Sequence, residues 1–132
     1  MSTRSAILIT VTAMVAGCAW QAPMSEVTGN LYSRVDMNTY PTGILSIDGE
    51  ATYYDPTTIT PGRHVLRVQG ASPSWSTAVK EYVLEVQPCV RYYIAAYRAA
   101  PNIPDWEVRI DEILPISGCP ATASASPSQY RY

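Results

Sequence analysis

The chain contains one histidine, His64, and this is the side chain best suited to act as a base near neutral pH. A serine or cysteine nucleophile needs such a base beside it, but no Gly-x-Ser-x-Gly motif accompanies the histidine. Because His64 directly follows a Pro-Gly-Arg sequence, we expect it at the start of a strand, packed or hydrogen-bonded near a turn. The alternatives are a catalytic or a pH-sensing histidine.

Two pairs of carboxylates, Asp111 with Glu112 and Glu81 with Glu85, have the residue types that glycosidases use for acid–base catalysis. Adjacent residues of a strand point to opposite faces, however, and carboxylates four apart on a polar face are usually only solvated. No glycine-rich phosphate loop precedes a helix either. We therefore predict a protein that is not an enzyme, with no catalytic residues and no cofactor.

Tyrosines give the clearest indication of binding, since the chain has ten Tyr, three Trp and no Phe. In the strand expected at residues 90–98, alternation places Arg91, Tyr93 and Tyr97 on the face opposite Tyr92. Exposed tyrosines beside an arginine are typical of protein interfaces, and a tyrosine ring can also stack on a sugar. The alternative is that both faces are covered, or that the tyrosines only shield the sheet. We predict Arg91, Tyr93 and Tyr97 as binding residues.

Length and composition restrict the class of protein. A chain of 132 residues with 47% hydrophobic and 15% charged residues is typical of one compact domain. The net charge is −2, and lysines and arginines do not cluster. This distribution argues against a nucleic-acid partner and against a polybasic segment that binds membrane surfaces.

The first 17 residues have the three-part layout of a secretory signal: a basic start, an apolar run and small residues. As a helix the apolar run, residues 5–16, would be about 18 Å long, whereas the hydrocarbon core of a bilayer is about 30 Å thick. It is therefore too short to span a membrane. The following residues, Val15-Ala16-Gly17-Cys18, resemble the lipobox of bacterial lipoproteins, in which the cysteine is diacylated and the preceding peptide is removed.

The lipobox resemblance implies that residues 1–17 are a signal peptide, that Cys18 is lipidated and that residues 18–26 form a tether. Two or three acyl chains hold a protein on a bilayer almost permanently. Ala19 is not the aspartate that favours inner-membrane retention in enteric lipoproteins, so the resemblance implies an outer-membrane protein on the periplasmic face. The alternative is an ordinary secretory signal followed by an incidental cysteine.

Once Cys18 is lipidated, Cys89 and Cys119 remain, and export to an oxidising compartment favours a disulfide between them. The expected strand at residues 90–98 follows Cys89, and a second at residues 106–114 precedes Cys119. An antiparallel hairpin of these strands would bring the two cysteines together at its open end. A metal site is the alternative, but two cysteines and one histidine fall short of the usual four zinc ligands. We predict one disulfide and no metal.

Turn signals recur every eight to twelve residues along the chain, as in all-β sandwiches, and no long helical period appears. Asp48-Gly49 favours a tight hairpin turn, and Pro61-Gly62 favours a turn before a strand. We predict a small antiparallel β-sandwich with one disulfide over residues 27–120 and a disordered tail at residues 121–132. Alternation predicts two buried strand faces: Lys80, Tyr82, Leu84 and Val86 in one strand, and Trp106, Val108 and Ile110 in another.

Ile47-Asp48-Gly49, followed by the strand from Pro61 to Val68, resembles PEGA-type and related prealbumin-like β-domains over residues 43–70. This resemblance implies an Ig-like or prealbumin-like sandwich. The second half, with Cys89, a Tyr-Tyr strand and a closing Cys119, is similar to small bacterial lipoproteins that imply no known activity.

These features together predict a non-catalytic accessory or adaptor lipoprotein. It would be anchored in the membrane by its lipid and would bind an envelope protein partner through a sheet edge or the Tyr/Arg face. The alternative is a carbohydrate-binding module that contacts cell-wall glycan or polysaccharide through Tyr93 and Tyr97.

Overall fold

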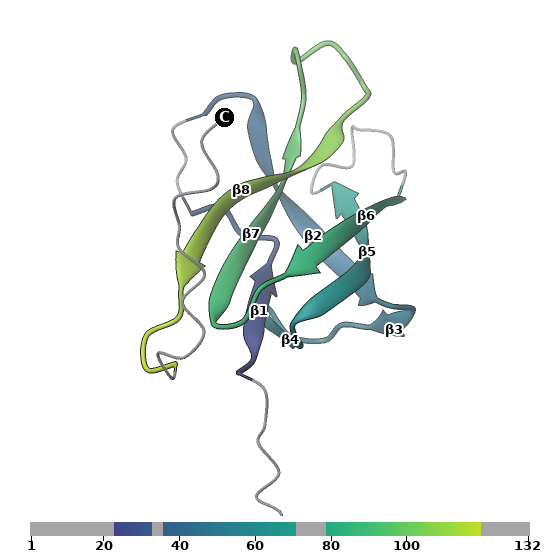
Figure 1. Cartoon of the computed structure of the whole chain (residues 1–132). Coiled ribbons are helices and arrows are strands. Elements are labelled where there is room, and N and C mark those ends of the chain that lie inside the picture. Colours follow the sequence, from purple (N-terminus) through teal and green to yellow (C-terminus); the bar gives the residue numbers. More distant parts are fainter. Residues whose placement is uncertain (1–22, 33–35, 71–78, 120–132) are drawn as a thin grey trace, which may run out of the picture.

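The computed structural model describes residues 23–32, 36–70 and 79–119 (Figure 1). The expected signal peptide, Cys18, most of the tether and the tail at residues 121–132 lie outside these ranges. Within them the regular secondary structure consists of eight strands: β1 Ser25–Thr28, β2 Thr39–Ile47, β3 Glu50–Ala51, β4 Thr57–Ile59, β5 Gly62–Gly70, β6 Val79–Val86, β7 Val90–Tyr97 and β8 Glu107–Pro115. The first strand, β1, begins inside the segment expected to be tether.

The described strands form one open sheet that is mostly antiparallel. Neighbouring strands follow the order β4-β1-β7-β2-β5-β6, while β3 pairs with β2 and β8 pairs with β7. The pairing of β1 with β7 is parallel, with Glu26 opposite Arg91. The prediction of an all-β domain is therefore confirmed. The observed arrangement differs from the predicted antiparallel sandwich in one respect. Its strands are joined edge to edge in one mixed sheet and are not divided between two antiparallel sheets.

Strand β7 is central to this sheet (Figure 1). Along one edge it pairs with β8 over its whole length, from Val90 opposite Pro115 to Tyr97 opposite Glu107. Its other edge is shared by β1, which pairs with residues 91–93, and by the start of β2, which pairs with residues 95–97. Strand β2 then continues alongside β5 and so connects the two halves of the sheet.

The buried apolar side chains come from both halves of the sheet and form one cluster, comprising Val27, Ile59, Leu66, Val68, Leu84, Val86, Tyr92, Ile94, Ala96 and Trp106. The predicted inward faces are confirmed. In β6, Leu84 and Val86 are buried and Tyr82 is half-buried, whereas Glu81 and Glu85 are exposed. Burial of these alternate residues is what fixes the register of the strand, because a slip by one residue would expose all of them.

In β8 the predicted alternation holds from Trp106 to Ile110 and then stops. Across β7, Tyr93 lies opposite Glu112 but the next residue lies opposite Ile110, so Asp111 is the extra residue of a β-bulge. The bulge leaves Asp111 half-buried, although alternation placed it on the exposed polar face.

Both predicted turns are present. Asp48 and Gly49 have φ values of 50° and 86°, and Ile47 pairs with Glu50 across them. Two consecutive residues with positive φ are the geometry of a type I′ hairpin turn, which Asp-Gly favours because glycine adopts positive φ without strain. At the second predicted turn the chain bends at Pro61, and β5 begins at Gly62.

Candidate functional site

Arg91 and Tyr93, two of the predicted binding residues, are half-buried and have partners within the domain. The Nε atom of Arg91 donates to Glu26 Oε2 at 2.6 Å, which links β7 to β1. Hydrogen bonds to Tyr93 and then to Glu26 raise the pKa of Arg91. The Tyr93 ring packs edge-to-face on Tyr32 with centroids 5.4 Å apart. These side chains are therefore held in place by the sheet and its neighbours.

Tyr97, the third predicted binding residue, is likewise half-buried. The guanidinium carbon of Arg109 lies 3.5 Å from the centroid of its ring, which is a cation–π contact between β7 and β8. Ala95, between the two outward tyrosines, is only 1% exposed. The structure thus brings Arg91, Tyr93 and Tyr97 onto one strand as expected, but each of them already has a partner in the domain.

His64 lies at the start of β5 and is hydrogen-bonded beside the β2–β3 turn, as predicted. Its Nδ1 is 2.6 Å from Asp48 Oδ2, and its Nε2 is 2.8 Å from the carbonyl oxygen of Thr60. The second oxygen of Asp48 accepts a hydrogen bond of 2.8 Å from the backbone N–H of Val65. Both ring nitrogens of His64 therefore face acceptors that join the turn to β5.

The carboxylate of Asp48 provides a test of this arrangement. The hydrogen bond from Val65, and next the one from His64, lower the pKa of Asp48 below its usual 3.8. A carboxylate with a lowered folded-state pKa adds stability above its unfolded pKa and loses it as the pH falls through the folded value. We therefore expect Asp48→Asn, which keeps a good turn residue, to lower the melting temperature at pH 7. Thermal unfolding from pH 7 to pH 2 should show the difference closing below about pH 4.

Asp111→Asn is the matched control, because there the sign is reversed. Burial, more than any other cause, raises the pKa of Asp111. Its ionisation therefore opposes folding as the pH rises through the folded value, so the substitution should raise the melting temperature at pH 7. An unchanged or raised melting temperature for Asp48→Asn at pH 7 would contradict the assignment of Asp48.

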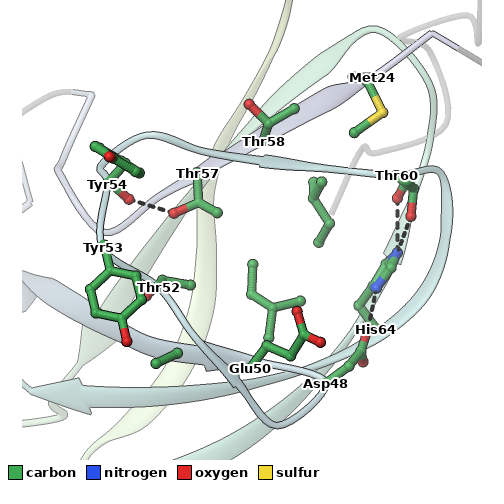
Figure 2. A pocket seen from close by; sticks show the side chains of 13 residues that line it. Met24, Asp48, Glu50, Thr52, Tyr53, Tyr54, Thr57, Thr58, Thr60 and His64 are labelled. Carbon is green, nitrogen blue, oxygen red and sulfur yellow. Dashed lines mark hydrogen bonds and ion pairs between the residues drawn. The ribbon is translucent and has the colours of Figure 1, made fainter.

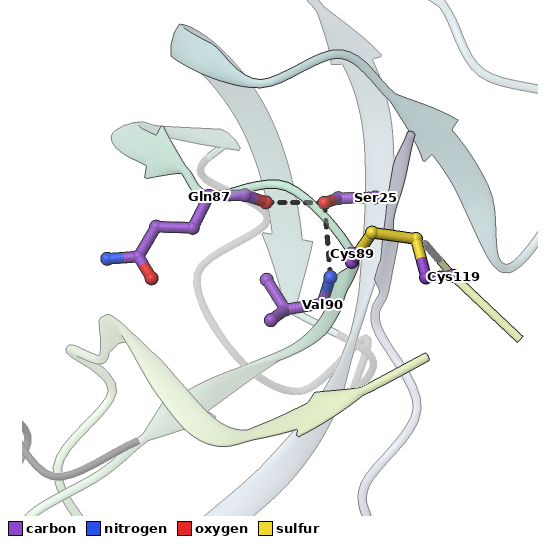
Figure 3. Close-up of a disulfide and its surroundings, with 5 residues drawn as sticks. All are labelled: Ser25, Gln87, Cys89, Val90 and Cys119. Atoms are coloured by element: carbon purple, nitrogen blue, oxygen red, sulfur yellow. Dashed lines mark hydrogen bonds between the residues drawn. A yellow bond between two sulfur atoms is a disulfide. The ribbon is translucent and has the colours of Figure 1, made fainter. Parts of the chain in front are cut away.

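The predicted disulfide is confirmed: Cys89 and Cys119 are bonded, with Cα atoms 5.7 Å apart (Figure 3). The turn before β7 is also fixed from β1, because the buried hydroxyl of Ser25 donates to the carbonyl of Gln87 and accepts from the N–H of Val90. On the other side of this turn, the Tyr92 hydroxyl accepts from the N–H of Gln87 at 2.9 Å. Strand β1, the turn before β7 and the segment that ends at Cys119 are distant in sequence but meet at this turn.

The outer edge of β6 is a candidate binding surface; the sequence predicted contact through a sheet edge but did not indicate which strand provides it. Within the described ranges β6 pairs with β5 alone, in unbroken register from Gly62 opposite Val86 to Gln69 opposite Val79. Val83 points away from the core and is 46% exposed, next to Val65, which is 37% exposed. Alternation already placed Val83 on the outward face, but the strand order is what puts it at an edge.

A pocket with a volume of about 510 Å³ lies between the β3–β4 loop and the start of β5 (Figure 2). Two tyrosines of the loop, Tyr53 and Tyr54, are 85% and 83% exposed. Neither tyrosine is among the binding residues predicted from the sequence. The signal that could have identified them is two adjacent aromatic residues directly before an Asp-Pro dipeptide, where a turn is expected.

No family model matches the chain, and no curated protein or solved structure matches it either. The fold and the disulfide define its class as a small all-β domain with one disulfide bond. Among the described residues no helix is long and apolar enough to span a membrane. The same residues contain no group of three or more His, Cys, Asp or Glu side chains placed to hold a metal ion.

Proposed function

We propose that this protein is a non-catalytic accessory lipoprotein, anchored through Cys18 on the periplasmic face of the outer membrane, that binds an envelope protein through the outer edge of β6. The lipobox supports the anchor, and the disulfide suits an oxidising compartment. The observation that carries the binding role is the unbroken register of β6, which among the described residues pairs with β5 alone. An extended segment of a partner can continue the sheet there with main-chain hydrogen bonds.

The edge strands β8 and β4 are less suited than β6 to pair with a partner strand. Strand β8 is interrupted by the bulge at Asp111, and bulges disrupt the ladder that a partner strand must join. Strand β4 spans only Thr57–Ile59. By contrast, the start of β6 is fixed by Lys80, whose ammonium group donates to Asp105 at 2.8 Å and to the carbonyl of Trp106. A partner strand would meet a preformed edge, with Val83 as an apolar contact.

The alternative of a carbohydrate-binding module that acts through Tyr93 and Tyr97 has less support. Both rings are half-buried and already pack on other side chains of the domain, Tyr93 on Tyr32 and Tyr97 on Arg109. A sugar would have to displace these contacts in order to stack on either ring.

We expect Val83→Lys, in the full-length protein isolated from cells, to lower the amount of co-purified partner at least tenfold. A lysine at an edge strand opposes strand addition, while the exposed position leaves the fold intact. The partner is identified first by a photo-crosslinking residue placed at position 83. Leu45, which is 38% exposed on β2, is the control position for both the crosslinker and the lysine substitution. Equal crosslinking from positions 45 and 83, or none from position 83, would overturn the assignment of this edge.

A further inference from the structure

The pocket beside the β3–β4 loop has an apolar floor and polar walls. Ile47 and Ile59 form the floor, and Ile59 is buried in the core cluster. Figure 2 shows the Glu50 side chain directed into the pocket, with Tyr53 and Tyr54 on one side and His64 on the other. Threonine side chains complete the wall, contributed by Thr52, Thr57, Thr58 and Thr60. Small-molecule sites combine an apolar lining with a few polar groups in this way.

The two tyrosines stand on a braced loop. The N–H of Thr52 donates to the carbonyl of Leu45 at 3.1 Å, and the hydroxyl of Thr57 donates to the carbonyl of Tyr54. Asn30 of the chain after β1 donates to Asp55 at 2.9 Å. Both tyrosine rings are more than 80% exposed, and neither has a hydrogen bond or a ring contact among the described residues. The loop backbone is thus braced, and its two exposed aromatic rings are a surface on which a flat ligand face can stack.

The charge of the lining selects against anions. Asp48 and Glu50 line the pocket, and the lining residues that the structure describes include no lysine or arginine. His64 is the basic group of the lining, but both of its nitrogens face acceptors already, Asp48 and Thr60. A phosphate, sulfate or uronate would therefore meet two carboxylates, and no described lining residue offers it a lysine or arginine. A neutral, hydroxyl-rich ligand can instead donate its hydroxyl hydrogens to Glu50 and exchange hydrogen bonds with the threonines.

We propose that this pocket binds an uncharged glycan that contains N-acetylhexosamine. The tyrosine rings would stack on the apolar face of a sugar, the threonines and Glu50 would bind its hydroxyls, and the apolar floor of Ile47 and Ile59 would accept the acetyl methyl group. None of the residues that line this pocket belongs to β6, so the inference does not depend on the proposed protein partner.

The test uses the purified full-length protein and chitotriose, an uncharged trimer of N-acetylglucosamine, with affinity measured by calorimetry. We expect chitotriose to bind, and Tyr53→Ala with Tyr54→Ala to weaken binding at least tenfold. Both residues are exposed, so the melting temperature should remain unchanged. Cellotriose, which lacks the acetyl groups, should bind at least tenfold more weakly, and a glucuronate oligomer should not bind.

Several results would overturn the inference. The first is the absence of chitotriose binding by the wild-type protein. The second is unchanged binding by the Tyr53→Ala, Tyr54→Ala variant, or loss of binding only when Tyr93 and Tyr97 are replaced, which would move the sugar site to β7. Val83→Lys is the control that separates the two proposals, because it should leave chitotriose binding intact while it removes the protein partner.

Discussion

Replacing both Cys89 and Cys119 with alanine is expected to lower the free energy of unfolding by about 3.6 kcal/mol. The disulfide joins residues 30 apart in sequence, and the chain-entropy model assigns a closed loop of roughly that length about 3.6 kcal/mol. Small domains have a total stability of about 5–15 kcal/mol, so a large part of the margin would be lost. Denaturant unfolding at pH 7 measures the difference directly.

The control for this prediction addresses the backbone at Cys89. Its φ is 64°, in the left-handed region that disfavours residues with a side chain, and it follows Pro88 as glycine does in a type II turn. In the absence of the disulfide, Cys89→Gly with Cys119→Ala should therefore be more stable than the double alanine variant, by about 1 kcal/mol. If the double alanine variant is as stable as the wild type, the disulfide does not stabilise the fold and the prediction fails.

The second prediction with a large expected effect is loss of the proposed membrane anchor. Cys18→Ala removes the thiol to which the proposed diacylglycerol is attached, so we expect complete loss of acylation and of the protein in outer-membrane fractions. Lipid chains account for the membrane attachment in this proposal, since two or three of them hold a protein on a bilayer almost permanently. Mass spectrometry of the natural protein and fractionation of cell membranes provide the measurement.

Ala19→Asp is the matched variant for the anchor. It leaves Cys18 in place, so lipidation should continue, while a bacterium that follows the enteric sorting rule should retain the protein at the inner membrane. An unmodified sulfur at Cys18, or a leader peptide still attached to the mature protein, would contradict the anchor itself.

The features that the sequence predicted are those set by local chemistry. Asp48-Gly49 specifies a type I′ turn because each residue tolerates positive φ, and the structure has both values. The alternation in Val79–Val86 predicts the buried Leu84 and Val86, since burial and a period of two act within one strand. The cysteine pairing followed from two strands that flank one loop.

The remaining features depend on contacts between distant segments. The parallel pairing of β1 with β7 joins Glu26 to Arg91, and nothing within either strand indicates it. The bulge at Asp111 arises from the fit of β8 to β7, so alternation alone placed that residue on the wrong face. The partners of the predicted binding residues are also distant in sequence, because Tyr93 packs on Tyr32 and Tyr97 on Arg109.

The position of β1 inside the sheet also determines how the domain would respond to mechanical force. Strand β1 lies between β4 and β7 and not at an edge, so it is hydrogen-bonded on both sides. A pull on the N-terminal side of Ser25 acts along the strand and at right angles to those bonds, which must then break together in shear and not one after another. A domain held at its N-terminus and drawn away by a partner would be loaded in its more resistant direction.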